Sequence, residues 1–243
     1  MKRKMKKFVL LLSTPLIAGL ALKTHAVFSA AETIAVQPTT TLIASSESEL
    51  LAVPLESQYE GIALGNGCEV TALSMLLQYY GYQTNKNQLA ALLDYVPVYV
   101  TEQLHGNPHD GFVGNIYGGL DAMGVAVEPI AAVAEEIVGQ DYQVMSSELS
   151  FQQLTALVTQ GTPVWVITTV DFQIPDSSDF KWWTTTSGTV EVSPLCHAAV
   201  ITGMTADTVY VNDPHGYQNR AVAKADFQMI YEAMGSQALY LRK

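Results

Sequence analysis

The sequence predicts an α+β protein in which an N-terminal helical part packs on a mainly antiparallel β-sheet. Two observations support this prediction. Helical patterns dominate the chain up to about residue 160, and β-rich runs dominate the rest. Strands and helices also do not alternate strictly, as they would around a parallel sheet. Residues 51–243 are numerous and apolar enough to form one domain around one core.

Helices are predicted where apolar residues recur at helical spacing and a glycine ends the pattern. The clearest example covers residues 69–80 and ends before Gly81, a residue type that commonly follows a helix C-terminus. Ser150 and Gln153 have the spacing of a capping box at the start of another helix. The predicted helices are 69–80, 84–93, 116–123, 130–138, 151–160 and 224–234.

Strands are predicted from short runs rich in β-branched and aromatic residues. They are 53–55, 125–127, 164–170, a hairpin within 182–192, 197–203, 208–213 and 238–241. The tryptophan pair of the hairpin, Trp182 and Trp183, either contacts a substrate or covers the sheet, and covering a sheet is the commoner role. A glycine-rich stretch at residues 105–114 interrupts these patterns and is expected to line a site.

The N-terminus has the features of a secretory signal peptide. Five basic residues within positions 2–7 precede an apolar run at 8–22, and small residues follow it. The run of about 15 residues is shorter than the roughly 20 that a membrane-spanning helix needs. We expect cleavage after Ala26 or, as the second choice, after Ala31. The predicted organisation is a signal peptide at 1–26, a flexible linker at 27–50 and a folded domain at 51–243.

Charge restricts the partners of the exported protein. Removing residues 1–26 takes away six of the twelve Lys and Arg residues and no Asp or Glu, so the formal net charge changes from −11 to −17. Nucleic acids and anionic membrane surfaces attract basic patches. We therefore expect neither as a partner, and we expect no stable membrane insertion after the signal peptide is removed.

A lone thiol lies between a glycine turn and the first predicted helix. Gly65, Asn66 and Gly67 precede Cys68, and the helix begins beside it. The unpaired N–H groups and the dipole of a helix N-terminus favour a thiolate, which is the nucleophilic form of cysteine. A buried structural cysteine, or a disulfide with Cys196, explains this stretch equally well when it is taken alone.

The two runs at 197–203 and 208–213 predict a general base and its partner. If they form a hairpin centred on Thr205, His197 and Asp213 are cross-strand neighbours, with Cβ atoms roughly 4.5–5.5 Å apart. The carboxylate can then hold one imidazole nitrogen and leave the other to face a thiol. Each residue alone has a structural explanation, but as a pair that follows a helix-start cysteine they favour catalysis.

Gln58 and Cys196 complete this arrangement. The Gln58 amide and the Cys68 backbone N–H are candidate donors to an oxyanion. Neighbouring residues of a strand point to opposite faces, so Cys196 should face away from the site if His197 faces it. A reduced, buried Cys196 is therefore favoured over a disulfide.

The remaining histidines raise the question of a metal site. His105 and His109 are four residues apart, but a glycine and a proline between them disfavour the helix that a two-histidine zinc site needs. No metal site is therefore predicted. His215 is a spare candidate base, and the turn at Asp213 and Pro214 is expected to direct it outward.

Six stretches of the chain together resemble a known protein family, namely 53–59, 67–77, 111–115, 161–164, 197–203 and 211–214. In sequence and order they resemble the C39-like cysteine peptidases of Gram-positive bacteria, across nearly all of residues 53–241. The resemblance implies a papain-like fold with Cys68 as nucleophile, His197 as general base and then acid, Asp213 as its orienting partner and Gln58 in the oxyanion hole. The chain has no transporter segments, so the leader-peptide substrates of the better-known C39 domains are not carried over.

These inferences predict a secreted or cell-surface cysteine peptidase that hydrolyses peptide bonds through a thioester intermediate. Two alternatives stay open. The same triad could act in cell-wall peptide or isopeptide hydrolysis or in acyl transfer, or the fold could serve as a binding or adhesion module without turnover. We expect a monomer that acts on a peptide or protein without a cofactor. A thiolate–imidazolium pair would let Cys68 react well below pH 8.5, the approximate pKa of a free thiol.

Overall fold

The computed structural model describes residues 50–243, so the predicted signal peptide and residues 27–49 of the predicted linker lie outside the described part. The helices are α1 (Cys68–Tyr79), α2 (Lys86–Leu92), α3 (Val127–Val138), α4 (Phe151–Thr159) and α5 (Lys224–Ala233). The strands are β1 (Tyr95–Val96), β2 (Phe112–Gly114), β3 (Ala122–Gly124), β4 (Gln143–Glu148), β5 (Val164–Thr169), β6 (Lys181–Thr185), β7 (Gly188–Val192), β8 (Cys196–Met204), β9 (Thr208–Asp213), β10 (Tyr217–Ala223) and β11 (Gln237–Arg242). None of the helices within residues 50–243 has the length and apolar character needed to cross a membrane.

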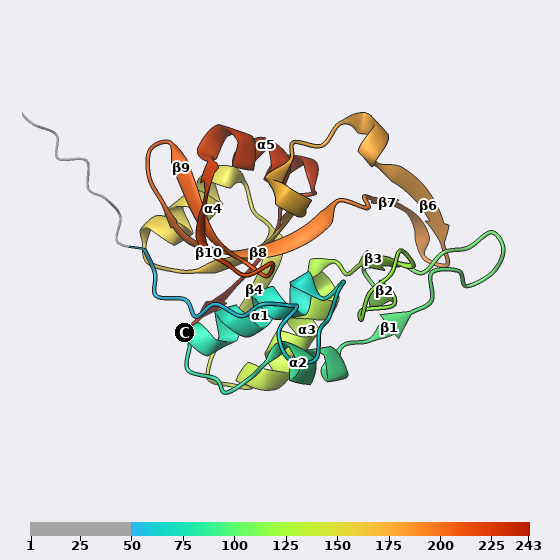
Figure 1. Ribbon diagram of the computed structural model, residues 1–243, viewed down its shortest axis with the longest axis horizontal. Coiled ribbons are helices and arrows are strands. Elements are labelled where there is room, and N and C mark those ends of the chain that lie inside the picture. The colour runs from blue at the N-terminus through green and yellow to red at the C-terminus, as the bar shows by residue number, and fades with distance from the viewer. Residues whose placement is uncertain (1–49) are drawn as a thin grey trace, which may run out of the picture. The chain divides into compact units, whose positions relative to one another are not determined.

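Six strands form the main sheet in the order β10-β9-β8-β5-β11-β4, and each neighbouring pair is antiparallel. Figure 1 shows three of these strands, β8, β9 and β10, side by side. This arrangement confirms the predicted α+β class. All six residues of β5 are buried, as expected of a continuous apolar and β-branched run at the centre of a sheet. β8 lies beside β5 and is buried from its second residue to its last. The residues that follow Cys196 are therefore held rigidly.

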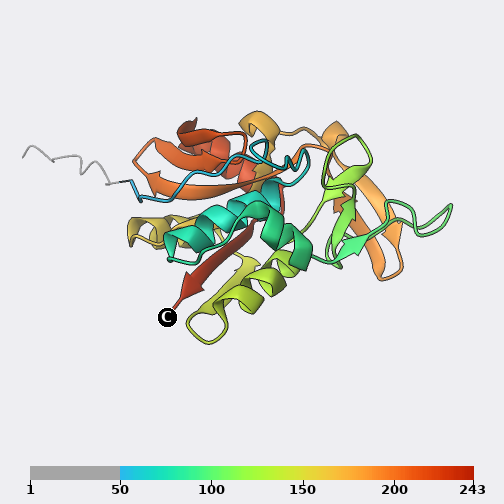
Figure 2. The same cartoon turned by 60° about the horizontal axis from the view of Figure 1, so that its bottom comes forward.

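Helix α1 joins the helical part of the chain to the sheet. It packs against β8 and β5, while α3 packs against β4 and β11 (Figure 2). Ten of the twelve residues of α1 are buried, so it is a central helix rather than a surface helix. The Trp165 indole N–H on β5 donates to the Glu69 carbonyl oxygen at an N to O distance of 3.0 Å. The first turn of α1 is thereby anchored to the middle of the sheet.

Helices α4 and α5 pack against each other and against β5. Ser150 and Gln153 form the predicted capping box at the start of α4, with both reciprocal hydrogen bonds present. The helix predicted at 84–93 is shorter than expected, because α2 covers Lys86–Leu92 after the N-cap Asn85.

The helix predicted at 116–123 is wrong. Residues 116–121 form turns and bends, and β3 follows them. Gly118 and Gly119 have φ angles of 145° and 89°. These conformations are open to glycine and interrupt a right-handed helix, so the apolar spacing of this segment was misleading.

The strand predicted at 125–127 is also wrong, because α3 begins at Val127, three residues before the predicted helix start. Pro129 lies in the first turn of α3, where a missing backbone N–H costs no helical hydrogen bond. The run at 53–55 forms no strand either. It is instead held by single contacts such as the Asn212 side-chain amide, which donates to the Val53 carbonyl oxygen.

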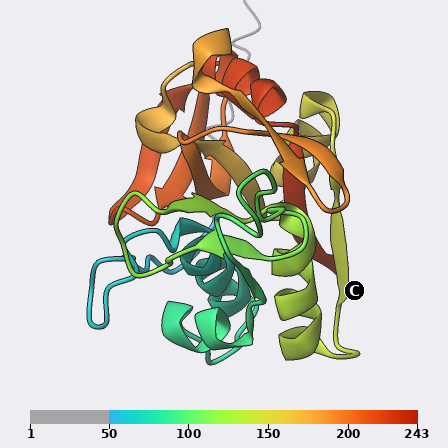
Figure 3. The same ribbon diagram turned by 90° about the vertical axis from the view of Figure 1, so that its right-hand side faces the viewer.

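Two small sheets lie outside the main sheet. β1, β2 and β3 form one, and the predicted hairpin β6–β7 forms the other (Figure 3). The hairpin separates its two tryptophans: Trp183 is buried and its ring stacks on His105 with centroids 4.2 Å apart, whereas 69 % of Trp182 is exposed. The commoner role, covering a sheet, therefore holds for Trp183 and not for Trp182.

Candidate active site

Cys68 is the first residue of α1, directly after the N-cap Gly67, whose lack of a side chain leaves the first N–H groups without a side-chain cap. The side chain is almost fully buried, at 6 % exposure. Cys68 lines one cavity together with His197 on β8. The thiol therefore lies near the predicted base.

The predicted His197–Asp213 pair is present. His197 Nε2 lies 2.8 Å from Asp213 Oδ1, and both side chains are buried. His197 Nδ1 bonds to no other residue within 50–243 and is the nitrogen left to take a proton. A cavity of about 140 Å³ is lined by both His197 and Cys68. The structure therefore places the candidate nucleophile beside the same cavity as the candidate base, and the candidate orienting carboxylate bonds to that base.

The strand register that produces this pair differs from the predicted one. β8 and β9 pair Val200 with Asn212 and Ile201 with Val211, two residues away from a hairpin centred on Thr205. The turn closes later than expected, with the Thr205 N–H donating to the Thr208 carbonyl oxygen, and a bulge follows. A shift of two residues keeps every side chain on its face. The pair therefore forms as diagonal neighbours rather than opposite ones.

Asp213 has two further partners that the sequence did not reveal. Arg220 Nη1 on β10 lies 2.8 Å from Asp213 Oδ2, and the His215 backbone N–H donates to Oδ1 at 2.9 Å. Burial alone would raise the pKa of Asp213, but the hydrogen bond and charge of His197, the His215 amide and Arg220 together lower the pKa to about 2. Asp213 is therefore a fixed carboxylate at neutral pH, able to stabilise an imidazolium.

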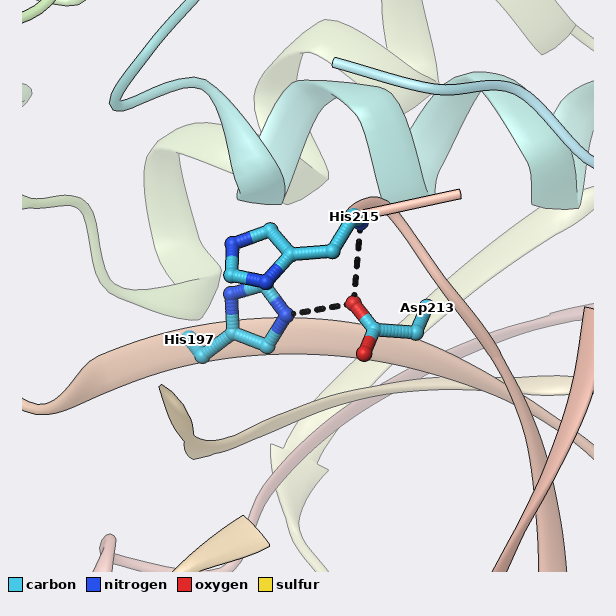
Figure 4. A group of neighbouring side chains, drawn as sticks. All are labelled: His197, Asp213 and His215. Atoms are coloured by element: carbon cyan, nitrogen blue, oxygen red, sulfur yellow. Dashed lines mark hydrogen bonds and ion pairs between the residues drawn. The ribbon is translucent and has the colours of Figure 1, made fainter. Parts of the chain in front are cut away.

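The expectation that His215 points outward is wrong. Its ring lies against His197 with centroids 4.5 Å apart, and it lines the same cavity (Figure 4). The two-residue register shift explains this position, because it places His215 rather than Asp213 opposite His197 when the pairing is continued. Tyr59 also contacts the His215 ring, at a centroid distance of 5.5 Å. His215 is thus part of the candidate site.

His197, Asp213 and His215 also form the one cluster among residues 50–243 with metal-binding potential, since one ligand atom from each lies within 4.8 Å of the others. The surrounding bonds disfavour that use. Asp213 already accepts hydrogen bonds at both oxygens, and the Arg220 guanidinium at 2.8 Å would repel a cation. His105 and His109 lie apart from this cluster, stacked on Trp183 and paired with Glu128 respectively.

Gln58 lies in the same cavity but is not free to donate to an oxyanion. Its Nε2 donates to the carbonyl oxygens of Leu64 and Gly65 at 3.2 and 2.9 Å, which uses both amide hydrogens. Its Oε1 is buried without a hydrogen-bond partner within 50–243. Gln58 therefore shapes the turn before Cys68, and donation to a substrate would require one of these bonds to be exchanged.

A sequence profile comparison identifies the family. The profile of the Peptidase_C39 like family matches residues 50–239, which is most of the chain. The chain belongs to this family. A crystal structure of a Bacillus anthracis protein assigned to the C39-like peptidases matches with a TM-score of 0.74 and 32 % identity, over 80 % of this chain and 96 % of that one. The uncharacterized protein YvpB of Bacillus subtilis (strain 168) is 38 % identical over 209 residues, 82 % of this chain and 81 % of that protein.

This membership confirms the predicted C39-like, papain-like fold. The structure also shows a residue beside Cys68 that the sequence reasoning missed. Glu69 follows Cys68 and is buried, with one carboxylate oxygen 3.2 Å from the Cys68 sulfur and the other accepting the Val125 N–H at 3.1 Å. Gly124, at φ 76°, leaves room for this carboxylate, because a Cβ there would collide with Glu69 Oε1. An acid next to a candidate nucleophile was the available signal.

Burial and the neighbouring Glu69 reverse the expected ionisation of the resting thiol. Burial, the Glu69 charge and the nearby Cys196 raise the pKa of Cys68 well above its ordinary value, and only the Ala198 backbone opposes them. The expectation that the helix start favours a thiolate is therefore wrong for this resting state. The physical reasons are that burial disfavours the charged thiolate, and that the Glu69 carboxylate accepts the thiol hydrogen and would repel a thiolate.

Cys196 does not face away from the site as expected, because it also lines the Cys68 cavity. Both cysteines are free thiols. Burial and the Glu69 charge raise the pKa of Cys196 as well. Cys196, like Cys68, is therefore a neutral thiol at neutral pH.

Replacing Glu69 by glutamine should shift the alkylation profile of Cys68 to lower pH. Glutamine keeps an acceptor for the Val125 N–H but removes the charge that opposes the thiolate. The rate of iodoacetamide alkylation, followed at Cys68 by peptide mapping across a pH series, measures the shift. Glu60→Gln removes the same charge from an exposed side chain and should leave the profile in place. An identical profile for Glu69→Gln and the unchanged protein would contradict this role.

Proposed function

We propose that this C39-like protein is an exported cysteine peptidase that hydrolyses peptide bonds with a Cys68–His197–Asp213 triad. The observation that carries the proposal is the buried 2.8 Å contact between His197 Nε2 and Asp213 Oδ1 in the cavity that also contains the Cys68 thiol. A buried structural histidine usually has both ring nitrogens hydrogen-bonded, because one is a donor and the other an acceptor. A base that must become charged needs a fixed carboxylate on one nitrogen and an open second nitrogen, and His197 has both.

In the proposed reaction the Cys68 sulfur attacks the substrate carbonyl carbon, and the thiol proton passes to His197 Nδ1. Asp213 stabilises the imidazolium, which then gives the proton to the leaving amine as the C–N bond breaks. A water molecule next attacks the thioester and gives a proton to His197 Nδ1. The carboxylic acid leaves, and the proton returns to the Cys68 sulfur. Because the resting thiol is neutral, this scheme requires proton transfer to accompany the attack.

The developing oxyanion needs donors that are already in position. The Cys68 backbone N–H at the start of α1 is one, because the first N–H groups of a helix have no partner within the helix. Gln58 would be the second if the substrate carbonyl displaces its bond to the Leu64 oxygen, which is the longer of its two bonds at 3.2 Å. The family suggests a peptide substrate, and the basic and apolar pattern of residues 1–26 supports export.

Digestion of a defined peptide mixture in H₂¹⁸O tests this function and separates its alternatives. The protein recovered from culture medium should start at Val27 or Glu32, and it should release peptides whose new carboxyl termini carry ¹⁸O. Products joined to an added amine, without ¹⁸O, would show acyl transfer instead of hydrolysis. If no peptide in the mixture is altered, the peptidase proposal fails and the binding-module alternative is favoured.

A further inference from the structure

A second, larger cavity of about 580 Å³ adjoins the proposed catalytic cavity. The two share three wall residues, Met123, Ser193 and Cys196. Cys196 directly precedes His197, so a peptide with its scissile carbonyl at Cys68 would reach this cavity with a neighbouring residue. Its volume lies within the range of roughly 300–1,000 Å³ that is usual for ligand sites.

The walls of the cavity combine an apolar floor with an acidic rim. Val125, Ile167 and Val192 are buried and form part of the floor. The rim carries four exposed glutamates from different elements, namely Glu128, Glu148, Glu191 and Glu232. Among residues 50–243, no Lys or Arg lines the cavity. A long aliphatic side chain that ends in a cation matches such walls, because its stem can lie on apolar surface while its charge meets carboxylates.

Two of the four glutamates lack any compensating partner. Glu128 is paired with His109 at 2.9 Å, and Glu232 accepts a hydrogen bond from Gln228. Glu148 and Glu191 make no ion pair and no side-chain hydrogen bond with any residue in 50–243. Their negative charges are therefore available to a ligand.

An aromatic ring independently indicates the same ligand chemistry. Trp182 lines the cavity, is 69 % exposed and is the direct cross-strand partner of Glu191 in hairpin β6–β7. Cross-strand partners share a face, so the indole and the carboxylate stand side by side. An indole face attracts ammonium and guanidinium groups, with Trp the strongest of the aromatic side chains. Contact with a cationic ligand would then explain why Trp182 is exposed while its neighbour Trp183 is buried.

We infer that this cavity is a specificity subsite for a lysine or arginine side chain of the peptide substrate, with Glu148, Glu191 and Trp182 as its recognition residues. The inference rests on the proposed peptidase function for the placement of the scissile bond. The recognition itself is a binding property and does not require turnover.

Binding to the Cys68→Ala variant of the mature protein tests the inference without turnover. The probes are a short acetylated and amidated Ala/Gln peptide with one central lysine, and the same peptide with norleucine, which keeps the stem and lacks the charge. Calorimetry at moderate salt should give a lysine preference of about five- to tenfold in Kd, the range expected for one or two partly exposed charge pairs. Adding Glu148→Gln and Glu191→Gln should reduce the ratio of the two Kd values to about one, and adding Trp182→Leu should lower it in part.

The matched control is the pair Glu135→Gln and Glu136→Gln on the exposed surface of α3, which removes the same charge away from the cavity. This control should keep the lysine preference. Equal Kd values for the two peptides, or an equal loss of preference in the control pair, would overturn the subsite and leave only a general attraction to an acidic protein. A lysine preference in binding without any cleavage by the unchanged protein would instead contradict the peptidase proposal alone.

Discussion

Replacing Cys68 by alanine should lower peptide hydrolysis by on the order of 10⁴-fold or more, which is the size of effect seen when a hydrolase loses its nucleophile. The variant should still fold, because alanine suits a helix start and Cys68 contributes only its sulfur to the core. Turnover of a cleaved peptide, measured with circular dichroism and thermal unfolding as folding controls, checks this result.

Cys196→Ser is the matched control for Cys68→Ala. It replaces the other free thiol of the same cavity and should keep most of the turnover. If Cys196→Ser lost activity while Cys68→Ala kept it, the nucleophile would be Cys196, and the assignment of Cys68 would be wrong. The pair of variants therefore identifies the nucleophile without any assumption about the substrate.

The second large effect is expected at Asp213. Asp213→Ala should lower kcat by about 10²–10⁴-fold, because His197 loses the acceptor that fixes its tautomer and stabilises its charge. It should also destabilise the fold by about 3–5 kcal/mol, since Arg220 and His197 lose a buried partner. Asp213→Asn keeps an acceptor for His197 and should recover part of the lost kcat. If Asp213 had only a structural role, Asp213→Asn would restore stability relative to Asp213→Ala without restoring kcat.

Acid unfolding gives a second readout for Asp213. Its pKa is about 2 in the folded protein and about 3.9 in an unfolded chain. A lowered pKa contributes stability above the unfolded value, and this contribution is lost as the pH falls from about 4 to 2. The difference between the folded and unfolded pKa values corresponds to about 2–3 kcal/mol in the free energy of unfolding. Asp213→Asn should remove this part of the acid dependence, and unfolding midpoints measured between pH 5 and 2 check it.

The sequence was sufficient for the fold class and for the parts of the site that depend on local patterns. The run at 164–169 is a central buried strand because it is continuously apolar and β-branched, and the glycine turn before Cys68 leads into α1 because the apolar residues that follow recur at helical spacing. β4 and β10 were missed because they are outer strands of the main sheet, with mostly exposed or half-buried residues and no clear alternation. The helix prediction at 116–123 was wrong for a different reason. The apolar spacing of a helix was present, but Gly118 and Gly119 interrupt it.

The pairing of His197 with Asp213 was predicted from a register that is two residues wrong. The prediction survived because side-chain direction repeats every two residues, so the error preserved the shared face. The same error hid His215, which occupies the position assigned to Asp213. Arg220 and Glu69 could not be placed from spacing, because their roles depend on a bulged third strand and on the rotation of α1 over the sheet.

Covalent labelling tests the central claim most directly, namely that Cys68 is a nucleophile activated by His197. A peptide vinyl sulfone with a lysine side chain should add once to the unchanged protein, and mass spectrometry of the digest should locate the adduct on Cys68. His197→Ala should form this adduct far more slowly at neutral pH, while both proteins should alkylate equally after denaturation. An adduct on Cys196, or equal labelling of Cys68 with and without His197, would contradict the account.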